Sequence, residues 1–408
     1  MIKYSDLGTH RKLNEIVMAG SHDAGITGGD KNAQTQTLDI GQQARAGVRF
    51  FDLRIAAFAT NQREHGVKKV EMRAFHADDS LHKVERKMRG VVGGTGTDVV
   101  ERSKLRGGTD KGLGLLEMLD DAFDFVSSAD FSSEFLILKF DKCTNWKLIA
   151  GMCQARLGQK LYTGGGNLNT KTLAQLAGKV IVAFMPDGYA QLDVDERVGI
   201  TPIKNLYKPP ANYDPTVAGL QYWGAGGTNP MNGKTQNAKM RENVSKQSKI
   251  LRSATMGVQV KKKFQFVRSV EYHNGAASPH AMGMMYWTTT GLLASIKSRN
   301  NHLWTVRNRL GLSEMWLNMF MEFAHYLQDA LPDNIDPSSY ASGGVLKMFM
   351  PNIVMIDFAD DDKCQYIYDL NNLAAVRLAA VTRAIELGEE VASAAMMVGR
   401  AVKGGCHA

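Results

Sequence analysis

The sequence predicts a parallel α/β protein, because short apolar strands alternate with helical segments through the first half of the chain. The runs 134–140 and 179–184 are short and bounded by turn-forming or polar residues, as buried strands are. Residues 115–126 carry apolar side chains at helical spacing. Five strand–helix alternations of this kind favour a parallel sheet covered by helices.

The bulk composition is that of a soluble globular protein with enough apolar material for a large core. The chain has 408 residues, of which 44% are hydrophobic and 22% are charged. Its 49 Lys and Arg against 41 Asp and Glu give a net charge of +8, which suits an anionic surface or substrate. A lipid surface, a phosphate ester and a nucleic acid all remain open on charge alone.

The cysteine pattern and the N-terminal residues indicate the cellular compartment. No Cys-x-x-Cys pair exists, so we expect no zinc site of that type and free thiols at Cys143, Cys153, Cys364 and Cys406. The N-terminal residues lack the apolar core of a signal peptide, and no run of 18 apolar residues exists. We therefore expect a cytoplasmic protein without a transmembrane segment, and export without a cleaved signal remains open.

The first predicted strand is the apolar run 16–19, which leads into Gly20-Ser21-His22-Asp23-Ala24-Gly25. A strand end that carries His22 and Asp23 between small residues can present both side chains to a ligand. In parallel barrels the C-terminal strand ends hold the chemistry. The alternative is the start of a helix, with Ser21 or Asp23 as its cap.

Residues 33–47 predict a loop and then a helix that ends at Gly47. The β-rich run 48–55 follows, with Asp52 and Arg54 two positions apart and hence on the same side of a strand. Such a pair at a barrel mouth indicates an anion site. The alternative is an internal salt bridge at the rim.

A second histidine ends the strand-like stretch 70–76. Two histidines at two strand ends are what phosphoryl transfer without a metal would use, one as base and one as acid. Imidazole exists in both forms near neutrality, because its ordinary pKa is about 6.5. The alternative for His76 is a surface or capping residue.

The basic, glycine-rich segment 83–112 predicts a mobile loop near the strand ends, and it is not a P-loop because no Gly-Lys-Ser/Thr follows its glycines. Lys139 lies inside a buried strand and therefore needs an anionic partner. The proline-rich range 186–281 predicts a long irregular excursion, with a short strand at 220–223. Within it, the Lys- and Arg-rich run 234–263 favours a solvated helix face over a membrane or nucleic-acid patch.

The last third of the chain predicts a strand at 284–290, a helix at 303–327 and a final buried strand at 352–360. Closing a barrel puts the last strand beside the first, so Asp357 can lie next to His22 and orient it. The alternative for Asp357 is a loop-entry residue. The alanine-rich tail, 373–402, predicts one or two helices that pack on the body or on a second copy.

Taken together, these features resemble the phosphatidylinositol-specific phospholipase C X-domain superfamily. The matching pieces occur in the family's order and span most of the chain: GSHDAG (20–25), FFDLRI (50–55), FHAD (75–78), FLILKF (135–140), MYWTTT (285–290) and IVMIDF (353–358). The resemblance implies a distorted (β/α)8 TIM-type barrel over residues 1–370, with an insertion at about 187–281 and a helical tail at 371–408.

The resemblance also implies roles for the residues. His22 would be the general base on the inositol 2-hydroxyl, and His76 the general acid on the departing diacylglycerol oxygen. Asp357 would hold His22 in the right tautomer, and Asp23 would lie near the phosphate and pair with His76. Substrate-binding roles fall to Lys139, Asp52, Tyr286 and Trp287.

Arg54 indicates the subtype. Calcium-dependent members carry an acidic metal ligand at this position, whereas a guanidinium supplies fixed charge and two parallel donors to a phosphate. The resemblance thus implies the bacterial type that needs no metal or other cofactor, acts on a phospholipid at a membrane surface and forms a cyclic 1,2-phosphate first. We expect no nucleic-acid binding.

The head group is less well defined than the reaction. At 184–185 the sequence has Phe-Met where bacterial members carry an inositol-binding arginine. Another phospholipid or a glycerophosphodiester therefore remains an alternative substrate, and a non-catalytic barrel that binds lipid or protein is the alternative of another class.

Overall fold

The computed structural model describes residues 1–29, 31, 33–64, 67–76, 112–206, 213–224, 258–264, 267–272, 281–288, 295–305, 312 and 351–372. The predicted loop at 83–112 except its last residue, most of the predicted helix 303–327 and the tail from 373 onward lie outside these ranges. Among the described residues, no helix combines the length and the apolar character needed to cross a membrane.

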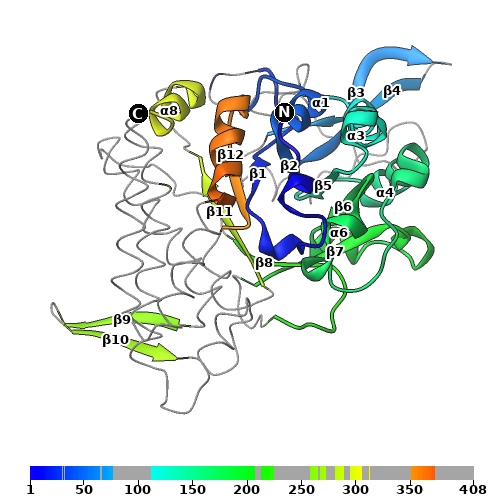
Figure 1. Ribbon diagram of the computed structural model, residues 1–408. Coiled ribbons are helices and arrows are strands. Elements are labelled where there is room, and N and C mark those ends of the chain that lie inside the picture. The colour runs from blue at the N-terminus through cyan, green and yellow to red at the C-terminus, as the bar shows by residue number, and fades with distance from the viewer. Residues whose placement is uncertain are drawn as a thin grey trace.

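Eight parallel strands form a closed barrel, which confirms the predicted TIM-type fold (Figure 1). The barrel strands are β1 (Met18–Ser21), β2 (Val48–Leu53), β5 (Phe135–Phe140), β6 (Lys179–Phe184), β7 (Ile200–Asn205), β8 (Leu220–Gly224), β11 (Met282–Trp287) and β12 (Ile353–Ile356). The order around the barrel is β1-β12-β11-β8-β7-β6-β5-β2, and β2 pairs with β1 to close it. The first and last strands are therefore neighbours, as the sequence predicts.

Two barrel strands lie inside the range that the sequence analysis assigns to an irregular insertion. Both β7 and β8 pair in parallel with their neighbours. The prediction of irregular structure was therefore wrong for β7, whereas the short strand predicted at 220–223 is present as β8. The sequence signal of β7 is weak because the strand is only half buried and contains Pro202, which normally demotes a run to an edge strand or a loop.

Two antiparallel hairpins stand outside the barrel (Figure 1). Strands β3 (Ile55–Glu64) and β4 (Val67–Ala74) form the first, so the predicted strand at 70–76 is not a barrel strand. Strands β9 (Val258–Phe264) and β10 (Val267–Tyr272) form the second. The run Lys261-Lys262-Lys263 lies in β9, which corrects the prediction of a helix face there.

Helices α1, α3 and α4 pack beside one another on the outside of the barrel (Figure 1). Helix α1 (Ile40–Ala46) begins with a capping box in which Asp39 accepts a hydrogen bond from the backbone N–H of Gln42, and it ends at Gly47, whose φ is +122°. Helix α3 (Leu115–Ser127) buries its apolar face, as predicted. The remaining α-helices are α4 (Trp146–Leu157), α5 (Leu173–Leu176), α6 (Pro186–Tyr189) and α8 (Ile296–Leu303), and residues 361–372 are also helical.

A buried ion pair fixes the chain's first residues to the N-terminal half of the barrel. Arg49 of β2 and Glu134, which directly precedes β5, are both fully buried, and Arg49 Nη2 lies 2.8 Å from Glu134 Oε2. The backbone N–H groups of Tyr4 and Ser5 donate to the same carboxylate. Hydrogen bonds thus satisfy this charge, as buried ions require.

Candidate active site

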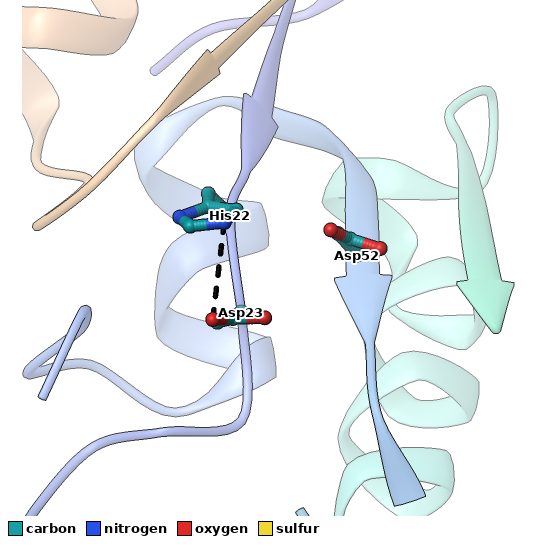
Figure 2. A group of neighbouring side chains, drawn as sticks. All are labelled: His22, Asp23 and Asp52. Carbon is teal, nitrogen blue, oxygen red and sulfur yellow. Dashed lines mark ion pairs between the residues drawn. The ribbon is translucent and has the colours of Figure 1, made fainter. Parts of the chain in front are cut away.

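The C-terminal ends of neighbouring strands bring the predicted site residues together. The register pairs Ser21 of β1 with Phe51 of β2 on one side and with Ile356 of β12 on the other. The residues that follow these three in the sequence are therefore neighbours as well, so that His22 lies between Asp52 and Asp357. Figure 2 shows His22 and Asp23 on the segment after β1, with Asp52 on β2 beside them.

Asp357 and Tyr286 hold the imidazole of His22. Nδ1 of His22 lies 2.9 Å from Oδ1 of Asp357, whose side chain is buried. The ring meets the Tyr286 ring edge-on, with centroids 5.7 Å apart and an angle of 83°. Because Nδ1 is hydrogen-bonded to Asp357, Nε2 is the nitrogen of His22 that can exchange a proton with a ligand.

The carboxylate of Asp23 connects the other predicted catalytic groups. Its Oδ2 lies 2.8 Å from Nδ1 of His76 and 3.8 Å from Nε2 of His22. Its Oδ1 lies 3.0 Å from Nε of Arg54, an ion pair whose angle is not that of a hydrogen bond. Asp23 adopts a left-handed backbone conformation, with φ at +44°, which aspartate tolerates better than most residues. One buried carboxylate thus orients two imidazoles and a guanidinium.

Arg54 presents its charge to the same space. It follows β2 directly, and its side chain keeps 15% of its exposure. Because Nε makes the contact with Asp23, the two terminal amino groups are the part of the guanidinium that can donate to a bound anion. Burial alone lowers the pKa of Arg54, but Asp23, Asp52 and Asp141 raise it above its ordinary value, which keeps the guanidinium charged.

His76 reaches the site from outside the barrel. It follows β4, and the backbone N–H of Phe75 donates to the carbonyl of Arg54, which ties the end of the hairpin to the end of β2. The side chain of His76 is 22% exposed, more than that of His22 at 13%. His76 is therefore the more accessible of the two imidazoles.

The carboxylates set the charge of His22. Burial lowers the pKa of His22, but the nearby Asp23 and the hydrogen bond to Asp357 outweigh it and raise the pKa to about 9. Burial raises the pKa of Asp23, yet Arg54 and the two histidines together hold it well below its ordinary range. Near neutral pH, the free protein thus holds a proton on His22 and a negative charge on Asp23.

Lys139 has the anionic partners that its burial demands. Its Nζ lies 2.9 Å from Oδ1 of Asp52, its partner in register across β2 and β5, and 3.2 Å from Oδ2 of Asp141. Burial lowers the pKa of Lys139, but Asp52 and Asp141 raise it well above the ordinary value. The structure thus pairs Asp52 with Lys139, and Arg54 pairs with Asp23 instead.

Sequence reasoning missed Asp141 and Tyr222. Asp141 is two residues beyond Lys139, a spacing that places both on one side of a strand and was the available signal. Tyr222 lies on β8, inside the supposed insertion, and burial raises its pKa to about 12. The charges of Lys139, Asp52 and Asp141 act on both Tyr222 and Tyr286, which puts the five groups in one polar cluster inside the barrel mouth.

Trp287 lies apart from the other predicted substrate-binding residues. Its side chain is fully buried, and strand alternation directs it to the opposite face of β11 from Tyr286. The structure therefore gives Trp287 a packing position.

His22, Asp23 and Asp52 are close enough to be compared with a metal site. One potential ligand atom from each lies within 4.8 Å of the others (Figure 2). Arg54 and His76 already contact Asp23, and Lys139 contacts Asp52. A divalent cation among these oxygens would face a guanidinium and an ammonium, so the donor set fits an anion better than a cation.

No family model and no curated protein matches the sequence. The fold is similar to solved structures of phosphatidylinositol-specific phospholipase C. A variant from Staphylococcus aureus is 17% identical, with a TM-score of 0.42, and the match covers 89% of this chain and 95% of that one. The enzyme from Listeria monocytogenes is 15% identical, with a TM-score of 0.42 and coverage of 90% and 97%. A calcium-dependent enzyme from Pseudomonas is 16% identical, with a TM-score of 0.28 and coverage of 49% and 69%.

Proposed function

We propose that this protein is a phospholipase C-type phosphodiesterase that cleaves phosphatidylinositol or a related phosphodiester lipid without a metal. The observation that carries the proposal is the position of Asp23, which contacts both His22 and His76 while Arg54 pairs with its other oxygen. Two imidazoles and a guanidinium around one space are the groups that in-line transfer of a phosphoryl group needs.

In this mechanism, neutral His22 accepts the proton of the head-group 2-hydroxyl at Nε2. The hydroxyl oxygen then forms a bond to phosphorus, and the bond from phosphorus to the diacylglycerol oxygen breaks. Protonated His76 gives its proton to that leaving oxygen. The products are diacylglycerol and a cyclic inositol phosphate, and the two histidines have exchanged protonation states.

Arg54 and Asp357 support the proton transfers. The terminal amino groups of Arg54 would hold the non-bridging phosphate oxygens, where negative charge grows in the transition state. Asp357 fixes Nδ1 of His22, so that Nε2 faces the substrate, and it stabilises the imidazolium that forms.

The polar cluster of Lys139, Asp52, Asp141, Tyr222 and Tyr286 would bind the head group. It combines hydrogen-bond donors and acceptors with two ion pairs that share Lys139, which suits a molecule with several hydroxyl groups. We propose a polyol head group on this basis, and inositol is the first to test.

The proposal is tested with vesicles that contain phosphatidylinositol, phosphatidylcholine or phosphatidylethanolamine, and with soluble glycerophosphoinositol, all in excess chelator. Phosphorus NMR distinguishes a cyclic phosphate from an open-chain phosphate, and diacylglycerol release gives the rate. We expect a cyclic product from phosphatidylinositol and rates unchanged by the chelator. Hydrolysis of another lipid alone would change the assigned head-group specificity. Loss of activity in chelator would refute the metal-free mechanism. If no substrate is hydrolysed, the result would favour a binding protein.

A further inference from the structure

The loop between β1 and α1 places two polar side chains behind His22 and Asp357. Thr35 and Gln36 are almost completely buried, with exposed fractions of 2% and 0%. Buried polar groups are normally hydrogen-bonded, so the partners of these two residues show what they hold in place.

The amide of Gln36 joins the ends of β1 and β12. Its Nε2 donates to the carbonyl of His22 at 3.0 Å and to that of Ile356 at 3.2 Å. Its Oε1 accepts the backbone N–H of Ala359 at 2.9 Å. One side chain therefore binds the main chain of His22 and the main chain on both sides of Asp357.

Thr35 completes this contact. Its Oγ1 donates to the carbonyl of Asp23 at 2.9 Å, and its carbonyl accepts the N–H of Phe358 at 2.6 Å. Phe358 has a φ of +51° and Asp23 a φ of +44°, conformations that cost free energy for residues with a Cβ. The two turns that carry catalytic side chains are thus each held by Thr35.

We propose that Gln36 is a positioning residue, which keeps His22 and Asp357 at hydrogen-bond distance by joining the two strand ends that carry them. The inference rests on the proposed function only in calling this pair catalytic. The structural claim is that a side chain that touches neither the imidazole nor the carboxylate controls the distance between His22 and Asp357. That distance in turn affects the proton affinity of His22.

The test replaces Gln36 by methionine, which has similar length and volume but no polar group. The matched control is Gln43→Met. Gln43 is equally buried and donates to the carbonyls of Ala24 and Leu38. Its replacement therefore removes similar hydrogen bonds, but none to His22 or to the residues that flank Asp357. Thermal unfolding of both variants shows whether each remains folded.

The main readout is the pKa of His22, measured by NMR titration of the imidazole, which needs no activity. In Gln36→Met we expect this pKa to fall from about 9 toward 6.5, because a looser bond to Asp357 favours the charged form less. In Gln43→Met we expect the value of the unmodified protein. An equal pKa in all three proteins would overturn the proposal, even if the proteins hydrolyse lipid.

A second readout uses activity. If Gln36 acts through His22 and Asp357, Gln36→Met as a single substitution lowers kcat/KM by about 10- to 100-fold, in line with the loss of a supporting contact around a reacting group. The same substitution should have little further effect in a protein that already carries Asp357→Asn. Fully additive effects of the two substitutions would contradict action through Asp357. If no substrate is ever found, the NMR titration still decides the structural claim.

Thr35→Val gives an independent variant in case Gln36→Met does not fold. Valine keeps the shape of threonine and removes only the hydrogen bond to the Asp23 carbonyl. A folded Thr35→Val protein should keep the His22 pKa, because the bonds from Gln36 are intact. A fall in that pKa as large as the one expected for Gln36→Met would show that the whole loop, and not Gln36, sets the geometry, and would overturn the assignment.

Discussion

Nδ1 of His22 lies 2.9 Å from Oδ1 of Asp357, although 335 positions separate the two residues in the sequence. The contact exists because β1 and β12 are parallel neighbours in register, which occurs only when the barrel closes. A partly folded chain without this closure would lack the pair, so the tautomer of His22 reports on the complete fold.

Replacing either histidine should abolish most of the hydrolysis. A positioned acid or base contributes roughly 100- to 10,000-fold, so His22→Ala and His76→Ala should each lose that much in kcat. The double variant should be little slower than the single variants, because both groups serve one step. The control is His10→Ala, an exposed histidine that precedes the start of β1, whereas the site lies at the ends of the strands, and this variant should leave kcat unchanged. Full activity in His22→Ala would contradict the mechanism.

Arg54→Lys should be almost as damaging as Arg54→Ala. Lysine keeps the charge but cannot present two parallel donors from a planar group, so both variants should lose on the order of 100- to 1000-fold in kcat/KM. Steady-state kinetics in chelator measures this, with Arg156→Lys on an exposed ion pair as the control. A rate in Arg54→Lys close to that of the unmodified protein would show that only the charge matters.

With a substrate whose leaving group needs no general acid, such as a nitrophenyl ester of the head-group phosphate, the kcat/KM of the unmodified protein should rise with pH up to about 9. His22 must lose a proton before it can act as a base, and its pKa in the free protein is about 9. Below that pH we expect about a tenfold rise per unit, as for a single ionisation. A flat profile between pH 6 and 9 would show that His22 is already neutral there.

Asp357→Asn should move this rising limb to lower pH. The hydrogen bond and the charge of Asp357 both raise the pKa of His22, so their loss lowers it. The maximal rate should still fall by roughly 100- to 10,000-fold, because the amide no longer holds the productive tautomer. Asp360→Asn, three residues further on and half exposed, is the matched control. An unshifted limb would mean that Asp357 does not act on His22.

Arg49 and Glu134 should affect stability rather than chemistry. Removing one partner leaves an uncompensated buried charge, so Arg49→Met or Glu134→Gln should lower the free energy of unfolding by about 3–5 kcal/mol. Urea unfolding measures the loss, and the KM of the remaining folded protein should not change. The exposed Arg156→Ala, which breaks a surface pair, should have little effect on unfolding. A small loss in both buried-pair variants would show that water replaces the missing partner.

The strand ends explain how much of the site the sequence could predict. His22, Arg54, Lys139 and Asp357 each lie at or just after a short apolar run, and in a parallel barrel such positions converge. The buried lysine also required an acid, and Asp52 supplies it. These predictions needed only local patterns and the rule that the barrel closes.

The remaining features depend on contacts between distant residues, which local patterns do not encode. Strand β7 is half buried and contains Pro202, so its place in the barrel is fixed only by its neighbours. The role of Gln36 is invisible in the sequence, because a glutamine in a loop has no spacing that predicts which carbonyls it will bind. The face of the sheet on which Trp287 lies depends on the register of β11, and a shift of the register by one residue would reverse it.

The two imidazoles come from different sheets, one from the barrel and one from the β3–β4 hairpin. In the proposed mechanism, the base therefore follows a strand of the barrel, whereas the acid follows a strand of the hairpin. If the proposal is right, substitutions in the hairpin change which alcohol departs, and substitutions at the end of β1 change how the attacking hydroxyl is activated.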